Sequence, residues 1–220
     1  MSIAVRLFGV LLAASLSACT AIRPSQPPLL SPFGDGTQWV VWEDLDFQVE
    51  LNDKSKTTIR VPRGFVTDLA STPPEVWSFY PPFGRYLSAS ILHDYLYWRQ
   101  TCKREEADKI FAQTMKDAGV PQQDQSRFYV VLRKAGEKAW SNNATEVKQG
   151  LVRVLPPEFL DLSSGKRSPN DSWKDVRAGL LKEGIKERPQ LSDSSIPLAC
   201  NALGQEIRVN TGLRSLIFGN

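Results

Sequence analysis

The chain has 220 residues, of which 41% are hydrophobic and 10% aromatic, so it can bury the core of one ordinary domain with an extension, or of two small domains. Its 27 basic and 24 acidic residues give a formal net charge of +3. This balanced charge, together with the lack of any Lys/Arg cluster, argues against nucleic acid as a partner.

The chain begins with the features of a secretory signal peptide. Arg6 supplies a basic start, an apolar run follows over residues 7–14, and small residues come next. The apolar run is too short to serve as a membrane span. We therefore expect residues 1–18 to be a signal peptide that is removed on export.

The last residues of this segment, Leu16-Ser17-Ala18-Cys19, resemble the lipobox of bacterial lipoproteins. The resemblance implies cleavage before Cys19 and attachment of lipid to its thiol and amine. Several acyl chains anchor a protein stably, because each buried methylene adds about 0.8 kcal/mol. Thr20 follows in place of Asp, which implies the bacterial cell envelope, at the outer membrane facing the periplasm. The alternative is a plain signal peptide that contains a cysteine by chance.

Two further cysteines, Cys102 and Cys200, lie in the exported part of the chain. An exported protein meets an oxidising compartment, so the two can form a disulfide, although the sequence leaves open whether they meet. Two cysteines and one histidine at these spacings do not match the usual zinc sites.

Strand patterns precede helix patterns along the chain. Residues 19–36 are rich in Pro, Ser and Gly, which predicts a lipid-anchored linker. Apolar side chains then alternate in part over residues 37–51 and 56–68, on either side of a turn with the sequence NDKS, which predicts a small antiparallel sheet or hairpin. Four prolines within residues 69–84 predict a loop with one short helical turn at residues 75–79.

Helical spacing of apolar residues returns over residues 85–100, 103–119 and 125–140. These segments predict a three-helix core. The pattern then weakens, and residues 142–220 predict a less regular extension with one short amphipathic helix near residue 175. The expected fold class is α+β: a small antiparallel sheet followed by three helices in a core domain at residues 37–141, with the C-terminal extension at 142–220.

The only histidine lies in the sequence His93-Asp94-x-x-Tyr97. On a helix His93 and Tyr97 share a face, whereas Asp94 is turned about 100° away. Asp108 lies on the packed stripe of the next helix, where a carboxylate needs a partner, and His93 is the obvious one. A histidine oriented by a buried carboxylate is a general-base arrangement. The alternative is a structural histidine that joins two helices.

Spaced motifs occur in order between residues 61 and 140: Val61-Pro62-x-Gly64-Phe65-x-Thr67-Asp68-x-Ala70-Ser71, Pro82-x-Gly84, His93-Asp94-x-x-Tyr97, Arg104-x-x-Ala107-Asp108-x-x-Phe111 and Gly136. In these motifs the chain resembles the bacterial and phage domain-of-unknown-function family numbered 1353. That resemblance implies no activity. Because the family is linked to phages, a non-catalytic envelope lipoprotein remains open, one that acts by phage exclusion or by contact with a partner protein.

The helix pair is also similar to the site of secreted phospholipase A2, most of all to its short bacterial and fungal members. This resemblance implies hydrolysis of phospholipid. His93 would activate a water, Asp108 would hold its other ring nitrogen, and Tyr97 would bond within the dyad. Asp94 would bind calcium, which would stabilise the oxyanion. A cell-wall-active enzyme is less favoured, because the chain has no GxSxG motif and no second histidine.

The loop before His93 departs from that enzyme class. It holds one glycine, Gly84, where those enzymes use a glycine-rich calcium loop, and their dense disulfide set is absent. Because calcium binds about six to eight oxygens, Asp68 is the best additional ligand. Asp68 can instead cap the turn toward Ser71. The aromatic residues of the loop can form a core lid or a lipid-facing lip: Trp77, Phe79, Tyr80 and Phe83.

Overall fold

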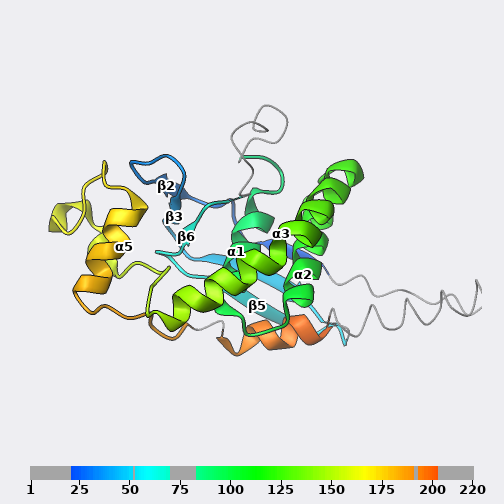
Figure 1. The fold of residues 1–220 in the computed structure, drawn as a ribbon. Helices are drawn as coiled ribbons and strands as arrows, with labels where there is room; N and C mark the ends of the chain where they lie inside the picture. Colours follow the sequence, from blue (N-terminus) through cyan, green and yellow to red (C-terminus); the bar gives the residue numbers. More distant parts are fainter. Residues whose placement is uncertain (1–20, 52, 70–82, 191–192, 203–220) are drawn as a thin grey trace, which may run out of the picture.

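In the computed structural model the strands come first along the chain and the helices follow (Figure 1). The residues described are 21–51, 53–69, 83–190 and 193–202. They form two antiparallel three-stranded sheets with the strand orders β1-β4-β5 and β2-β3-β6. The strands are β1 (Ile22–Pro24), β2 (Leu30–Pro32), β3 (Trp39–Val41), β4 (Leu45–Glu50), β5 (Lys56–Val61) and β6 (Val66–Thr67). The arrangement confirms the predicted α+β class.

The helices lie beside and between these sheets (Figure 1). None of those that the structure describes is long and apolar enough to cross a membrane. The helices are α1 (Leu87–Arg99), α2 (Arg104–Asp117), α3 (Gln122–Lys148), α4 (Pro157–Leu160), the 3-10 helix η2 (Leu162–Ser164) and α5 (Trp173–Lys182), and a helical segment at residues 195–202 follows.

The strands β4 and β5 form the predicted hairpin. Phe47 pairs with Ile59 and Leu45 with Val61, and all four side chains are buried. The intervening side chains on β4 are polar and more exposed, as expected when one face of a sheet covers a core. Helix α1 packs against this buried face.

The Pro-rich segment is not the linker that its composition predicts. Within residues 19–36, β1 pairs with β4 and β2 pairs with β3. Ile22 and Phe33 are buried, at 0% and 3% exposed. Both strands lie at sheet edges and end in proline, at Pro24 and Pro32. Proline lacks an N–H, which an edge strand does not need, so the prolines are compatible with the sheets.

Helix α1 is buried around most of its circumference. Nine of its 13 residues are buried, from Ala89 through Trp98, which is typical of a helix enclosed on all sides. The sheet β1-β4-β5 covers one side, and α2 and α3 cover others. The polar side chains of α1 therefore lie where each needs a partner.

The C-terminal extension completes the fold. Helix α3 runs to Lys148, so the predicted boundary at residue 142 falls inside a helix. Beyond it, Phe159 and Trp173 pack with Phe33 in a second core around the β2-β3-β6 sheet. The predicted short helix is α5, capped by Ser172, whose hydroxyl accepts from the Asp175 N–H.

The backbone of Gly64 explains how the extension approaches the sheet. Its φ is +94°, and a Cβ there would lie 2.6 Å from the Leu155 carbonyl oxygen. The Leu155 N–H donates to the Gly64 carbonyl at 2.9 Å. Any side chain at this position would push the backbones of residues 64 and 155 apart.

Two contacts fasten the last described helical segment to the core. Cys102, just before α2, forms a disulfide with Cys200, with Cα atoms 6.2 Å apart. Arg99 at the end of α1 binds the Asp193 carboxylate through two nitrogens. The disulfide closes a loop with a sequence separation of 98 residues.

Removing this disulfide should lower stability markedly. A long closed loop restricts the unfolded chain, so Cys102→Ser with Cys200→Ser should reduce the free energy of unfolding by about 2–4 kcal/mol. Urea denaturation of the variant and the wild type measures this. Reductant should lower the wild-type midpoint to that of the variant and leave the variant unchanged. A variant as stable as the oxidised wild type would contradict the expectation.

Candidate active site

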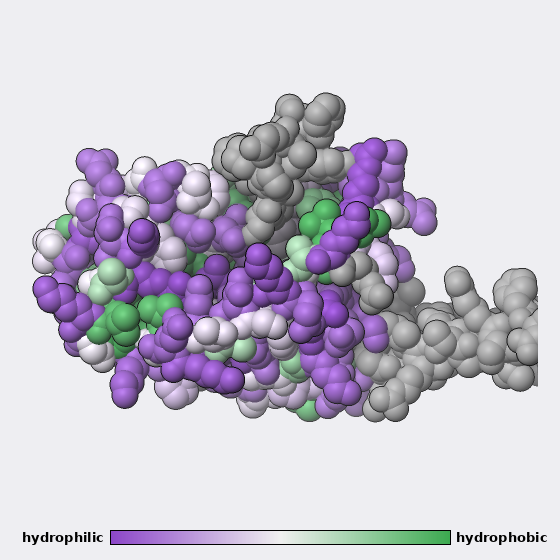
Figure 2. Space-filling view, viewed as in Figure 1, coloured by the Kyte–Doolittle hydropathy of each residue, from purple (hydrophilic) through white to green (hydrophobic). Residues whose placement is uncertain are grey.

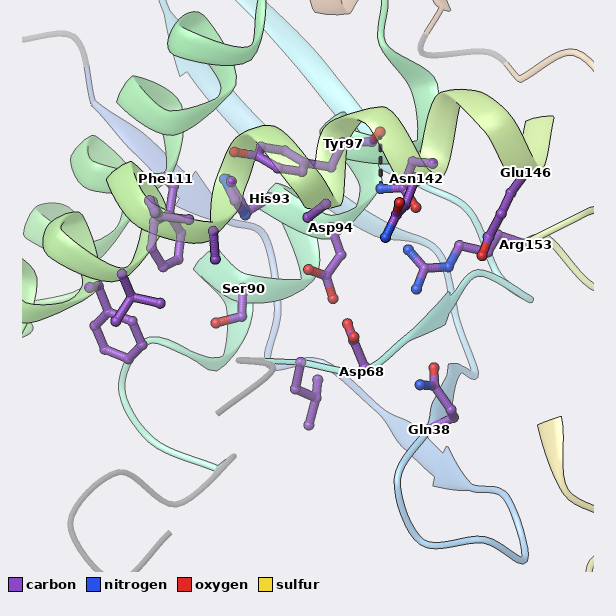
Figure 3. Close-up of a pocket in the computed structure, with 18 of the residues that line it drawn as sticks. Gln38, Asp68, Ser90, His93, Asp94, Tyr97, Phe111, Asn142, Glu146 and Arg153 are labelled. Carbon is purple, nitrogen blue, oxygen red and sulfur yellow. Dashed lines mark hydrogen bonds between the residues drawn. The ribbon is translucent and has the colours of Figure 1, made fainter. Parts of the chain in front are cut away.

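A cavity of about 640 Å³ lies beside α1 and α3, next to the end of β6 (Figure 3). Helix α1 contributes Ser90, His93, Asp94 and Tyr97 to it. The volume is in the range of small-ligand sites, about 300–1,000 Å³. The other lining residues come from α2, α3, the position before β3, the segment just after β6 and the C-terminal extension, and include Gln38, Asp68, Leu69, Phe111, Phe128, Leu132, Gly136, Arg153 and Arg177.

His93 and Asp108 form the predicted pair. The His93 Nε2 atom lies 3.0 Å from Oδ1 of Asp108. Tyr97 donates its hydroxyl to the same oxygen at 2.6 Å, and Arg104 donates to Oδ2 at 2.9 Å. The i, i+4 spacing of His93 and Tyr97 on α1 directs both side chains to one carboxylate of α2.

The charge state of Asp108 fixes the tautomer of His93. Burial raises the pKa of Asp108, but hydrogen bonds from His93 and Tyr97 and the charge of Arg104 outweigh it, so the pKa is below its usual range. An ionised carboxylate only accepts hydrogen bonds, so His93 Nε2 carries the proton toward it. In the neutral ring Nδ1 is then left as a proton acceptor.

Tyr97 acts as a hydrogen-bond donor here. Burial and the Asp108 carboxylate raise the pKa of the Tyr97 hydroxyl, so it stays protonated.

Aromatic rings contact the His93 imidazole from two sides. The His93 ring centre lies 4.1 Å from that of Tyr97 and 4.8 Å from that of Phe111. His93 is 7% exposed and still lines the cavity.

Asp94 lies beside His93 in the sequence but has a separate set of partners. Thr67, at the end of β6, donates its hydroxyl to Oδ2 of Asp94 at 2.5 Å. The carboxyl group of Asp68 faces that of Asp94 (Figure 3). Burial raises the pKa of Asp94 well above its usual range, and Asp68 raises it further, whereas Arg153 and Thr67 lower it. The structure thus brings together both predicted metal ligands.

The chain holds Asp68 in this position at some cost in backbone strain. The next residue, Leu69, has a φ of 60°, in the left-handed region that leucine rarely adopts. Its N–H donates to the Thr67 hydroxyl at 2.9 Å. Such strain, about 1–3 kcal/mol, is typically found where function constrains the backbone. The predicted alternative, a cap toward Ser71, involves residues outside those described.

The carboxyl pair suits a hard cation only in part. Two facing carboxyl groups need either a shared proton or a cation between them. Gln38, which lines the same cavity, has a buried Oε1 atom without a hydrogen-bond partner. Carboxylate and amide oxygens are ligands that calcium accepts, but the side chains of Asp68, Asp94 and Gln38 alone offer fewer than the roughly six to eight oxygens it requires.

Three polar groups of the cavity were missed by the sequence analysis. Gln38 Oε1, Ser90 Oγ and Arg153 Nε are buried, and none has a hydrogen-bond partner within the part of the chain that the structure describes. Each such atom costs about 1–3 kcal/mol when left unpaired. Gln38 and Arg153 lie far from His93 in sequence, and no spacing in the sequence indicates them.

The predicted aromatic loop lies mostly outside the described residues, including Trp77, Phe79 and Tyr80 and the predicted turn at 75–79. Phe83 is described. It is 53% exposed and packs edge-on against Trp39, with ring centres 5.5 Å apart. This placement leaves both predicted roles of the loop untested.

One comparison with known proteins matches the segment that carries these residues. Residues 39–132 match the family described as Protein of unknown function (DUF1353), which confirms the predicted resemblance. The matched segment runs from β3 into α3 and includes Asp68, His93, Asp94 and Asp108. No curated protein and no solved structure gave a significant match.

A substitution of Gly136 tests the packing around Tyr97. A Cβ at Gly136 on α3 would lie 2.8 Å from the Tyr97 hydroxyl oxygen and 3.3 Å from Nη1 of Arg104. Gly136→Ala should therefore displace the hydroxyl from Asp108 and lower the free energy of unfolding. Gly179 on α5 is the control, because a Cβ there meets nothing within 4 Å. Gly179→Ala should stabilise by up to about 1 kcal/mol, the usual helical preference. Thermal denaturation measures both, and equal stabilisation by the two would contradict the packing.

The pKa of Asp108 predicts a pH-dependent contribution to stability. Its folded pKa is below the unfolded value of about 3.9, so the contribution is fully present above that pH and is lost as pH falls through the folded pKa. Asp108→Asn should lower the free energy of unfolding near neutral pH by about 1–3 kcal/mol. The difference from wild type should shrink below about pH 4. Urea denaturation at pH 7 and pH 3 measures it, and an equal difference at both would refute the assignment.

Proposed function

We propose that this chain is a hydrolase of the phospholipase A2 type, which cleaves the ester of an amphiphilic lipid. The supporting observation is that His93 Nε2 and the Tyr97 hydroxyl meet on one oxygen of Asp108, while His93 also lines the cavity. Because Nε2 is taken by Asp108, the chemistry of the ring in the cavity falls to Nδ1.

In this mechanism Nδ1 of His93 removes a proton from a water as the water attacks the ester carbonyl. Asp108 stabilises the positive ring that forms, and Tyr97 and Arg104 hold Asp108 in place. The ring then returns the proton to the leaving alkoxide. Asp94 and Asp68 would hold a calcium ion, which when bound supplies positive charge for the developing oxyanion.

Apolar side chains at one end of the cavity fit an acyl chain. Phe111 on α2 and Phe128 and Leu132 on α3 all line it. The rings of Phe111 and Phe128 pack edge to face, with their centres 5.8 Å apart. Such a wall favours the hydrocarbon part of a substrate, since burial of each methylene contributes about 0.8 kcal/mol.

Fatty-acid release from mixed phospholipid vesicles tests the proposal. The protein is used from Thr20 onward, which retains every residue of both cores. His93→Ala should reduce the rate by about 10²–10⁴-fold, the usual worth of a general base. Asp94→Asn and a chelator should each abolish any calcium-dependent part of the rate.

The exposed substitution Lys174→Ala on α5 is the matched control and should leave the rate unchanged. If folded wild-type protein releases no fatty acid with or without calcium, the hydrolase proposal fails. A non-catalytic envelope lipoprotein that binds an envelope or phage protein would then be the better description.

We also propose that the mature protein is anchored in the bacterial envelope by lipid on Cys19, facing the periplasm from the outer membrane. Support comes from the lipobox-like sequence before Cys19. Cells grown with radiolabelled palmitate should label the wild type and leave Cys19→Ser unlabelled, with a larger unprocessed form. Equal labelling of both would refute the anchor.

A further inference from the structure

The end of the cavity opposite Phe111 is polar and holds the positive charge of Arg153, which also lowers the pKa of nearby Asp94. Arg153 and Gln38 both line this part of the cavity (Figure 3). The backbone of Arg153 is fixed, since its N–H donates to Glu187 at 2.8 Å and its carbonyl accepts from the Val66 N–H at 2.8 Å. Its side chain lies over the Trp98 ring, 5.8 Å from the ring centre. Among the residues that the structure describes, no carboxylate lies within salt-bridge distance of Arg153, although its charge acts on Asp94.

The neighbouring Arg177 shows the contrast. Its Nη2 atom donates to Glu146 at 2.7 Å and its Nε to the Val152 carbonyl at 3.1 Å. Glu146 and Arg177 thus neutralise each other at the cavity edge. Arg153 Nε, by comparison, is buried without a hydrogen-bond partner, as is Gln38 Oε1. The fork of an arginine side chain suits the two oxygens of a phosphate or carboxylate.

The two ends of the cavity give it a direction. Phe111 marks one end, Arg153 marks the other, and His93 and Asp94 lie between them (Figure 3). A molecule with an apolar chain at the first end and an oxyanion at the second would place its central bonds beside His93. A neutral molecule would leave Nε of Arg153 buried and without a hydrogen-bond partner.

We propose that Arg153 and Gln38 form a subsite for an oxyanion, so that the cavity selects amphiphiles that carry a phosphate or carboxylate group. As a statement about substrate, this rests on the proposed hydrolase function. As a statement about binding, it does not require catalysis. Arg153 supplies charge and paired donors, and the amide nitrogen of Gln38 supplies a further donor.

Ligands without an ester separate binding from hydrolysis. Decyl phosphate, decanoate, decanol and inorganic phosphate are titrated into the wild type, with the fluorescence of Trp173 at the cavity wall and calorimetry as readouts. Decyl phosphate and decanoate should bind at least about 10-fold more tightly than decanol, because charge-assisted hydrogen bonds have that worth. Inorganic phosphate should bind more weakly than decyl phosphate, since it leaves the apolar end unfilled.

Three variants locate the effect. Arg153→Met keeps the packing on Trp98 and should weaken decyl phosphate binding by about 10–100-fold, with decanol changed less than about 2-fold. Gln38→Glu keeps the side-chain volume and places a negative charge in the subsite. It should therefore also weaken the binding of decyl phosphate, and it tests the subsite even if Arg153→Met does not fold. Lys174→Met is the control, because Lys174 on α5 is exposed and does not line the cavity. It should change the binding of neither decyl phosphate nor decanol.

The subsite is overturned if decanol binds as tightly as decyl phosphate, or if folded Arg153→Met and Gln38→Glu bind decyl phosphate like the wild type. Equal affinity for inorganic phosphate and decyl phosphate would overturn the proposal that the ligand needs an apolar chain. These outcomes are independent of the vesicle assay. Hydrolysis without anion selectivity would leave the proposed function and remove the subsite, and anion-selective binding without hydrolysis would do the reverse.

Discussion

The structure depends on the burial of α1, a helix that carries polar side chains of the cavity, His93, Asp94 and Tyr97 among them, through the centre of the protein. Because this helix is enclosed, His93, Asp94 and Tyr97 each require a polar partner from another element. Asp108 on α2 serves His93 and Tyr97, and Thr67 at the end of β6 serves Asp94. The positions of α2 and β6 relative to α1 are thereby tied to the same residues that form the cavity.

The third helix and the second core follow from that constraint. Helix α3 can approach the pair only where Gly136 leaves room for the Tyr97 hydroxyl. It is also fastened to α1 by Asn143, which donates to the Tyr97 carbonyl at 3.3 Å. The extension after α3 then returns to the sheet at Gly64 and brings Arg153 to the cavity. The C-terminal extension, which the sequence pattern separates from the core domain, therefore supplies one wall of the cavity.

Local patterns predicted those parts of the fold that local forces determine. The helices α1 and α2, the β4–β5 hairpin and the meeting of His93 with Asp108 follow from spacing along one helix or between two neighbours. The strands β1 and β2 could not be predicted, because their proline-rich sequence becomes a strand only by pairing with β4 and β3. Gln38 and Arg153 escaped notice for the same reason, since long-range packing alone brings them to the cavity.

The arrangement of charges bears on whether the His93 pair only joins two helices. A structural pair would be complete with His93, Asp108 and Tyr97. It would not need a second carboxyl group, Asp68, placed against Asp94 on a backbone strained at Leu69. Two carboxyl groups that face each other destabilise a fold unless a proton or a cation lies between them. This unfavourable arrangement lies beside a histidine with one ring nitrogen left to accept a proton, as is typical of reactive centres. It therefore favours the proposed hydrolase over a His93 that only joins two helices.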